Sequence, residues 1–175
     1  MKFLAVSGSG RQNSTNTELL RALARVAPSE HSIHVYADVA RLPVFTPDLE
    51  DGQLPDQVQH LTGLIRECDG VIVSSPEYVR SIPGGLKNAI DWLVSRDEII
   101  SEPIILLHAS HRGDDMLDQL RTVLSTVSDR FNRDVFARFD LIKRPPEEIP
   151  EYFQKPGNEQ KLRHFLRQFV DFCLR

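Results

Sequence analysis

FLAVSGSGRQNSTNTELLRALA, residues 3–24, joins a short apolar run to a polar loop and then to an amphipathic segment. Residues 3–6 are continuously apolar, which is typical of a strand that is covered on both faces. The apolar positions within residues 19–27 recur at helical spacing and therefore predict a helix. A strand, a glycine-rich turn and a helix in this order indicate the start of a parallel α/β sheet.

The same alternation continues along the rest of the chain. Further strands are predicted at residues 33–36, 70–73, 104–107 and 135–139, and further helices from the apolar stripes within residues 58–68, 86–94, 117–127 and 162–173. Right-handed crossovers favour a doubly wound sheet, with either the flavodoxin-like strand order 2-1-3-4-5 or a half-Rossmann arrangement. The pattern alone does not decide between them. The Pro-rich stretch Arg144-Pro145-Pro146, with Tyr152 and Phe153, is expected to form the connection into the last helix.

The composition excludes several classes of protein. The 175 residues are 41% apolar and 26% charged, which predicts one soluble domain over residues 1–175. The net charge of -4 argues against nucleic acid as a partner. Cys68 and Cys173 lie far apart and fit neither a disulfide framework nor a zinc site. No apolar run reaches 18 residues, so we expect a cytoplasmic protein without a membrane partner.

The loop of residues 7–16 is rich in hydroxyl, amide and guanidinium donors and precedes a helix N-terminus, where N–H groups attract anions. In doubly wound folds, ligands bind beyond the carboxyl ends of the strands. The loop lacks the Gly-Lys pair of a P-loop, and Asn13 stands where a dinucleotide fingerprint needs its third glycine. We expect a phosphate cradle here. The alternative is that Ser14 or Thr15 only caps the helix.

The loop of residues 74–85 follows the third predicted strand. Pro76 and Pro83 stiffen its ends, and Gly84 and Gly85 let the backbone approach a flat ligand closely. Its backbone, with one acid and one tyrosine, could position a heterocycle without supplying a proton-transfer pair. We therefore expect this loop to hold an aromatic ring.

Three sets of residues resemble a known family: Gly8-Ser9-x-Arg11-x-x-Ser14-x-Asn16; Leu42-Pro43 with Asp48-Leu49-Glu50; and Pro76-Glu77-Tyr78 through Ser81-Ile82-Pro83-Gly84 to Leu86-Lys87-Asn88-Ala89-Ile90-Asp91-Trp92. They look like the NAD(P)H-dependent FMN reductase family, which includes quinone, azo-dye and chromate reductases. The resemblance implies a flavodoxin-like three-layer sandwich with the order 2-1-3-4-5, bound FMN, and NAD(P)H as hydride donor. It also implies ping-pong transfer to a second small-molecule acceptor and assembly into a homodimer or homotetramer.

Carried over by position, the resemblance assigns cofactor contacts to three loops. The residues are Ser9, Arg11, Ser14, Thr15 and Asn16 at the phosphate, Pro76, Glu77, Tyr78, Val79, Arg80 and Ser81 around the ring, and Ser110 and His111 after the fourth strand. Val79 stands where similar proteins usually have Asn, and the third loop is poorer in glycine than theirs. His111 or Arg112 could favour negative charge on the reduced ring. No catalytic acid or base and no metal ligand is expected, because FMN supplies the reactivity.

Other interpretations of the same residues are a non-enzymatic FMN-binding electron carrier or redox-sensing module, a phospho-receiver and an FMN-free interaction domain. The phospho-receiver would need an acid where Ser74, Ser75 and Pro76 end the third strand. His108 and His111 have no further metal ligand at a recognisable spacing, so packing and loop roles are expected. The helix dipole explains Asp114 and Asp115 at a helix start, and Trp92 is expected in packing or a subunit contact.

Overall fold

The computed structural model describes residues 1–50 and 52–175 and has a five-stranded parallel sheet. Its strands are β1 (Lys2–Ser7), β2 (Ser32–Tyr36), β3 (Val71–Ser74), β4 (Ile104–His108) and β5 (Phe131–Arg138). Their order is β2-β1-β3-β4-β5, which confirms the flavodoxin-like fold and excludes the half-Rossmann order. β1, β3 and β4 are buried almost throughout, as their continuously apolar sequences predict.

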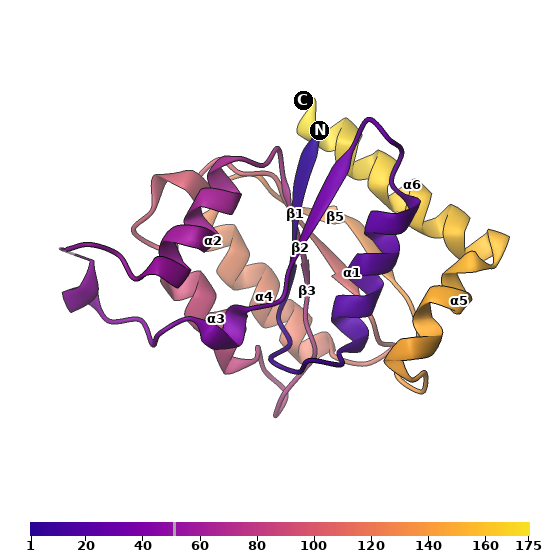
Figure 1. Ribbon diagram of the computed structural model, residues 1–175, viewed down its shortest axis with the longest axis horizontal. Coiled ribbons are helices and arrows are strands. Elements are labelled where there is room, and N and C mark those ends of the chain that lie inside the picture. Colours follow the sequence, from indigo (N-terminus) through magenta and orange to yellow (C-terminus); the bar gives the residue numbers. More distant parts are fainter. Residues whose placement is uncertain (51) are drawn as a thin grey trace.

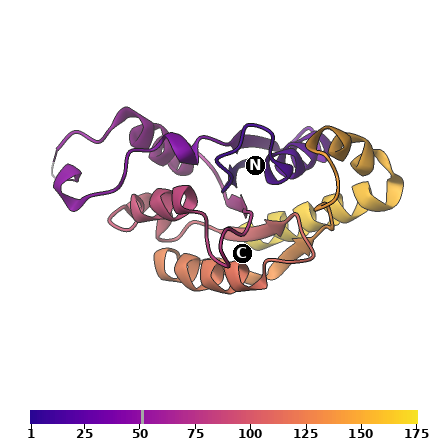
Figure 2. The ribbon, with the colours of Figure 1, turned by 90° about the horizontal axis from the view of Figure 1, so that it is seen from below.

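Among the described residues, six α-helices cover the sheet, and they form two layers, one on each face (Figure 1). They are α1 (Thr15–Val26), α2 (Asp56–Arg66), α3 (Gly84–Asp91), α4 (Asp114–Val127), α5 (Ile149–Gln154) and α6 (Pro156–Cys173). Helices α1, α5 and α6 lie on one face, and α2, α3 and α4 lie on the other (Figures 1 and 2). Each layer has its own apolar core against the sheet.

Three predicted boundaries were wrong. β5 begins at Phe131 rather than Val135, because a register shift between Ile104 and Leu106 lets β4 pair with both halves of this edge strand. The predicted connection before the last helix contains a helix of its own, since α5 includes Tyr152 and Phe153 and buries Ile149 and Phe153. The third predicted helix extends too far: residues 86–94 were expected to be helical, but α3 ends at Asp91, and Val94 is 64% exposed.

Trp92 follows α3 and is completely buried. Its Nε1 donates a hydrogen bond to the Pro43 carbonyl at 2.8 Å, and Phe45 packs edge-on against its ring. The Asn88 side chain donates to the same carbonyl at 2.9 Å and accepts from the Phe45 amide at 2.8 Å. The predicted packing role of Trp92 is confirmed: it anchors the start of the segment that projects from the body in Figure 2.

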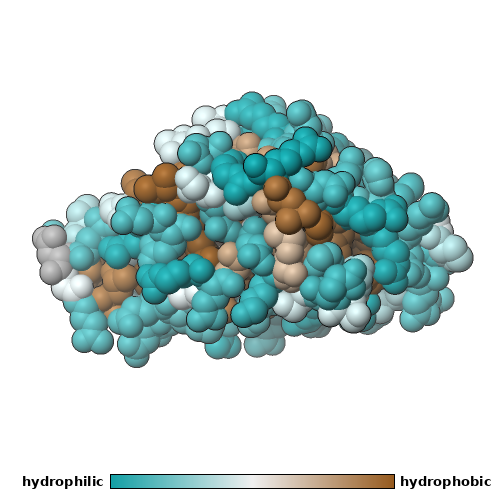
Figure 3. Space-filling view, turned by 90° about the horizontal axis from the view of Figure 1, so that it is seen from above, coloured by the Kyte–Doolittle hydropathy of each residue, from teal (hydrophilic) through white to brown (hydrophobic). Residues whose placement is uncertain are grey.

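All five strands run in the same direction, so their carboxyl ends meet at one end of the sheet, the lower end in Figure 1. Both chain termini lie at the other end, which Figure 3 shows from outside with a mainly hydrophilic surface. No helix among the described residues is long and apolar enough to cross a membrane. Because ligands of such sheets bind beyond the carboxyl ends of the strands, a ligand site is expected among the loops at that end.

Candidate active site

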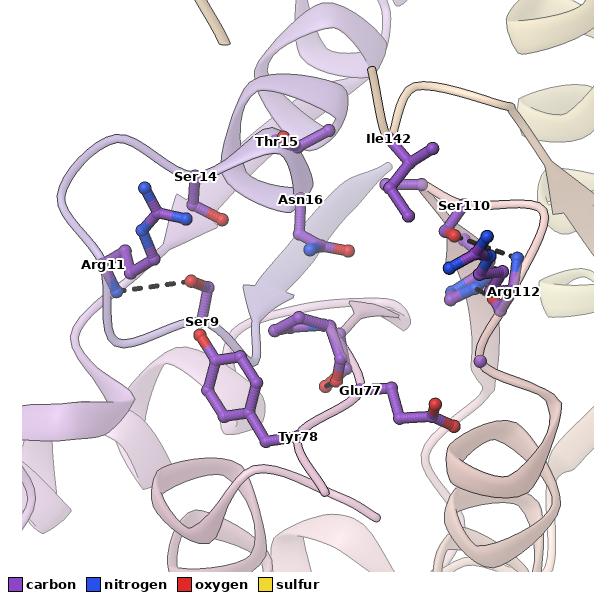
Figure 4. Close-up of a pocket in the computed structure, with 15 residues that line it drawn as sticks. Ser9, Arg11, Ser14, Thr15, Asn16, Glu77, Tyr78, Ser110, Arg112 and Ile142 are labelled. Atoms are coloured by element: carbon purple, nitrogen blue, oxygen red, sulfur yellow. Dashed lines mark hydrogen bonds between the residues drawn. The ribbon is translucent and has the colours of Figure 1, made fainter. Parts of the chain in front are cut away.

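A cleft of about 330 Å³ lies across the carboxyl ends of β1, β3 and β4 (Figure 4). Its volume is in the range of small-molecule sites. Residues from four segments line it: Ser9, Arg11, Ser14, Thr15, Asn16, Ser75, Pro76, Glu77, Tyr78, His108, Ala109, Ser110, Arg112, Gly113 and Ile142. The loops after β1 and β3, from which an anion site and a ring site were predicted, therefore face the same cavity.

The loop after β1 is fixed by buried hydrogen bonds beneath it. Ser7 and Thr17 join their hydroxyls at 2.8 Å, and Ser74 Oγ donates to Asn16 Oδ1 at 2.9 Å. Ser14 caps α1 by accepting from the Thr17 amide at 3.4 Å. The amides of Thr15 and Asn16, in the first turn of α1, have no acceptor within the helix. They are available to an anion in the cleft, where the helix dipole favours negative charge.

Arg11 adds a full positive charge to this end of the cleft. Its backbone amide donates to Ser9 Oγ at 3.3 Å, and in Figure 4 its guanidinium extends toward Ser14. Among the described residues, none forms a salt bridge with Arg11. A guanidinium beside a helix N-terminus is suited to a phosphate group, which it can bind through two hydrogen bonds.

Gly8 allows the first two loops to approach each other. Its amide donates to the Ser74 carbonyl at 2.8 Å. A Cβ at this position would lie 2.6 Å from Ser75 Oγ and 2.7 Å from Leu86 Cδ2. Any larger residue would have to push the loop after β1 away from the loop after β3. The close packing of the first loop against Ser75 and Leu86 therefore depends on this glycine.

Glu77 and Tyr78 leave the second loop in different directions. The Tyr78 ring extends toward Ser9 across the mouth of the cleft in Figure 4 and is 43% exposed. The Glu77 carboxylate accepts a hydrogen bond from the Met116 amide at 3.1 Å, in the first turn of α4. Glu77 thus joins the second loop to α4. Tyr78 supplies an aromatic surface and a hydroxyl.

Val79, Arg80 and Ser81 were predicted at the cofactor but do not line the cleft. Val79 and Arg80 have φ angles of 53° and 57°, and the amides and carbonyls of Tyr78 and Ser81 bond reciprocally at 3.1 and 3.0 Å. This is a two-residue turn of the type that joins antiparallel strands. It carries the three residues away from the cavity, and Val79 is 99% exposed.

The loop after β4 closes the other end of the cleft. Ser110 lines it as predicted, whereas His111 does not. His111 Nδ1 lies 2.8 Å from Asp140 Oδ1, which holds the ring outside the cavity. Arg112, the other residue expected to favour negative charge on the ring, does line the cleft. Ile142, which follows β5 and had no local sequence signal, reaches the cavity because β5 lies beside β4.

His108 is a buried histidine under this loop. Its Nε2 lies 2.5 Å from the Arg112 carbonyl, and Gly113, with φ of 98°, packs against the ring so closely that a Cβ would lie 3.0 Å from Nε2. Burial lowers the pKa of His108, so the neutral ring donates from Nε2. Nδ1 is buried without a hydrogen-bond partner among the described residues. The expected loop role of His108 is confirmed.

The chemistry of the cleft is divided between its two ends. Hydroxyls, helix amides and Arg11 gather at the α1 end, where the Tyr78 ring lies beside Ser9, while Ile142 lies with Ser110 and Arg112 at the opposite side (Figure 4). An elongated ligand with an anionic tail and a flat, polar-edged head fits this arrangement. Of the described residues, no group of three or more His, Cys, Asp or Glu is placed to hold a metal ion.

Comparisons with known proteins agree with this chemistry. Residues 1–134 match the family model described as NADPH-dependent FMN reductase. The chain is 35% identical over 116 residues to a quinone reductase from Escherichia coli, covering 65% of this chain and 61% of that protein. It is 40% identical over 92 residues to a 2-hydroxy-1,4-benzoquinone reductase from Burkholderia, covering 53% and 49%. The alignments thus span about half to three fifths of these relatives.

Solved structures share the fold. The flavoenzyme NAD(P)H:(acceptor) oxidoreductase FerB from Paracoccus denitrificans superimposes with a TM-score of 0.75 at 23% identity, covering 98% of this chain and 96% of that one. An NADH:FMN oxidoreductase, EMOB, superimposes with a TM-score of 0.65 at 22% identity, covering 99% and 88%. At these identities the likeness extends to the arrangement of strands and helices.

Proposed function

Because the chain belongs to the NADPH-dependent FMN reductase family, whose members are oxidoreductases that use FMN and NAD(P)H, we propose that its cleft binds FMN and catalyses two-electron reduction of a quinone-type acceptor. The observation that carries the proposal is the convergence of two loops on one cavity. A phosphate cradle ahead of α1 and a proline-stiffened loop after β3 line the same cleft, so one mononucleotide can touch both.

In this proposal the α1 end holds the phosphate. Ser9, Ser14, Thr15 and Asn16 supply hydroxyl, amide and backbone donors, and Arg11 supplies the charge. A buried hydrogen bond from Ser74 fixes the Asn16 side chain, so this side chain needs little further ordering on binding. Preorganised donors of this kind lower the entropic cost of binding.

Pro76, Glu77 and Tyr78 position the ring in the same proposal. Glu77 is held by the Met116 amide and therefore sets the backbone of the loop rather than moving a proton. Ser110 and Arg112 lie at the opposite side, where a hydroxyl and a positive charge favour an electron-rich ring edge. When bound, FMN would supply hydride acceptance from NAD(P)H and two-electron delivery to a quinone, azo compound or chromate. NAD(P)H and the acceptor would use the same exposed face of the flavin ring one after the other, as in a ping-pong reaction.

The proposal is tested by reconstituting the purified protein with FMN and following NADH and NADPH oxidation in the presence of a quinone. We expect FMN binding at micromolar concentration and turnover that depends on the quinone. FMN binding without nicotinamide oxidation would instead support an electron carrier or redox-sensing module. Absence of flavin binding would refute the proposal and leave the loops as simple turns.

Three wider statements accompany this proposal. We propose that residues 1–175 form one FMN-binding domain and that the protein works in the cytoplasm, where its two free cysteines suit a reducing compartment. We also propose a homodimer or homotetramer, with the turn that carries the 99% exposed Val79 as part of the subunit contact. Light scattering in solution tests the assembly, and a monomer at micromolar concentration would contradict it.

A further inference from the structure

The turn beside Tyr78 has an unusual backbone. Both central residues, Val79 and Arg80, lie in the left-handed region with φ of 53° and 57°. Such turns favour Asn and Gly, whereas a β-branched residue in this region is an outlier because its Cβ crowds the following carbonyl oxygen. Val79 is 99% exposed, so burial of its side chain does not compensate for the strained backbone. Another contact must hold the turn in place.

Gln119 on α4 makes that contact. Its Nε2 donates to the Arg80 carbonyl at 2.9 Å, and its Oε1 accepts from the Ser81 hydroxyl at 2.6 Å. Both ends of one side-chain amide are therefore bonded to the turn. Arg80 also pairs with Asp115 at 2.6 Å, but this ion pair is exposed and exposed ion pairs contribute little.

Hydrogen bonds connect the turn to the residues that line the cleft. Tyr78, which reaches across the mouth of the cleft, is bonded through its own amide and carbonyl to Ser81. Glu77, the preceding residue, is bonded to Met116 of α4. The segment 77–81 is thus fastened to α4 on both sides of Tyr78. Loss of the Gln119 contacts would let the strained turn relax and carry Tyr78 with it.

We infer that Gln119, which lies outside the cleft, is a positioning residue: its side-chain amide holds the strained Val79–Arg80 turn, and the turn holds Tyr78 at the flavin site. The inference rests on the proposed FMN binding for its effect on the cofactor. The holding of the turn itself is independent of the cofactor.

The test uses one substitution that removes the Gln119 contacts and two second substitutions at Val79 that should restore what is lost. Gln119→Ala should weaken FMN binding by about fivefold to tenfold, the scale of one or two net hydrogen bonds. It should also accelerate amide hydrogen exchange at Tyr78 and Ser81 in the FMN-free protein. Alanine is a good helix former, so α4 should remain intact. Thr122→Ala, one turn along α4 and bonded only within the helix, is the matched control and should change neither measurement.

Adding Val79→Asn or Val79→Gly to Gln119→Ala should restore both FMN affinity and amide protection to within about twofold, because these residues tolerate the left-handed backbone. Glycine has no side chain, so rescue by both variants excludes a new contact as its cause. FMN affinity and exchange unchanged in Gln119→Ala, or losses that neither suppressor reverses, would overturn the inference. If the wild-type protein bound no FMN, the proposed function would fail while the exchange data still decided the role of Gln119.

Discussion

Replacing Arg11 by alanine should weaken the binding of FMN and leave the binding of riboflavin unchanged. The two ligands share the ring system and differ by the phosphate, and Arg11 lies at the helix end of the cleft with its guanidinium toward Ser14. The substitution removes one positive charge from an exposed side chain. Its backbone amide bond to Ser9 Oγ can remain.

The size of the effect follows from the exposure of the guanidinium. Hydrogen bonds to charged groups contribute about 1.5 to 3 kcal/mol net, and exposed ion pairs about 0.2 to 1 kcal/mol. Arg11 is exposed but faces a helix N-terminus that also binds the anion, so a value of about 1 to 2 kcal/mol is appropriate. This corresponds to a loss of about fivefold to thirtyfold in FMN affinity.

Fluorescence titration of FMN and riboflavin against wild type and variant measures both affinities. Arg21→Ala is a suitable control, because Arg21 is an exposed arginine of α1 that pairs with Glu18. The wild-type preference for FMN over riboflavin should shrink as salt is raised, since exposed charges are screened. Equal losses for the two flavins, or an unchanged FMN affinity, would refute the assignment of Arg11 to the phosphate.

Three further predictions concern stability. Gly8→Ala should lower the free energy of unfolding by about 1 to 3 kcal/mol in urea titration, because its Cβ would lie 2.6 Å from Ser75 Oγ; wild-type stability would show that the loops separate easily. Burial holds the folded pKa of His108 below its ordinary 6.5, so the unfolded chain binds the proton more readily and stability should fall as pH drops below 6.5. His108→Gln should flatten this slope, and an identical slope in the variant would exclude His108 as its source. Glu102, just before β4, accepts a hydrogen bond from Cys68 Sγ at 3.3 Å. Burial raises its folded pKa from 4.5 to about 7, so its ionisation costs stability as pH rises through that window. Glu102→Gln should therefore be more stable than wild type at pH 8, by about 1 kcal/mol after allowance for solvent screening, and not near pH 4; a pH-independent difference would contradict this.

Much of the fold was predictable because its central strands are buried on both faces. Continuous apolar runs predict β1, β3 and β4, and the rule that ligands lie at strand carboxyl ends brings the right loops together. β5 was harder to delimit, because it lies at the sheet edge and mixes polar with apolar residues. The six residues of α5 are too few to show a helical period.

Some residues of the site could not be predicted from the sequence, for a different reason. The family resemblance predicts residues 79–81 at the cofactor, but the turn geometry directs them away from the cleft. Neither Val79 nor Arg80 signals a left-handed backbone in the way that Asn-Gly does. His108 and Ile142 reach the cleft only through the packing of β4 and β5. Their contribution depends on tertiary structure rather than on local sequence.

Trp92 is the single tryptophan of the chain, and its indole is sealed between α3 and the backbone of Pro43. Its intrinsic emission therefore arises from one site with a known environment. A red shift of this emission would report that residues 43–45 have moved away from α3 and that water has reached the indole ring. Optical spectroscopy can thus follow detachment of that segment separately from melting of the sheet, whose loss far-ultraviolet dichroism records.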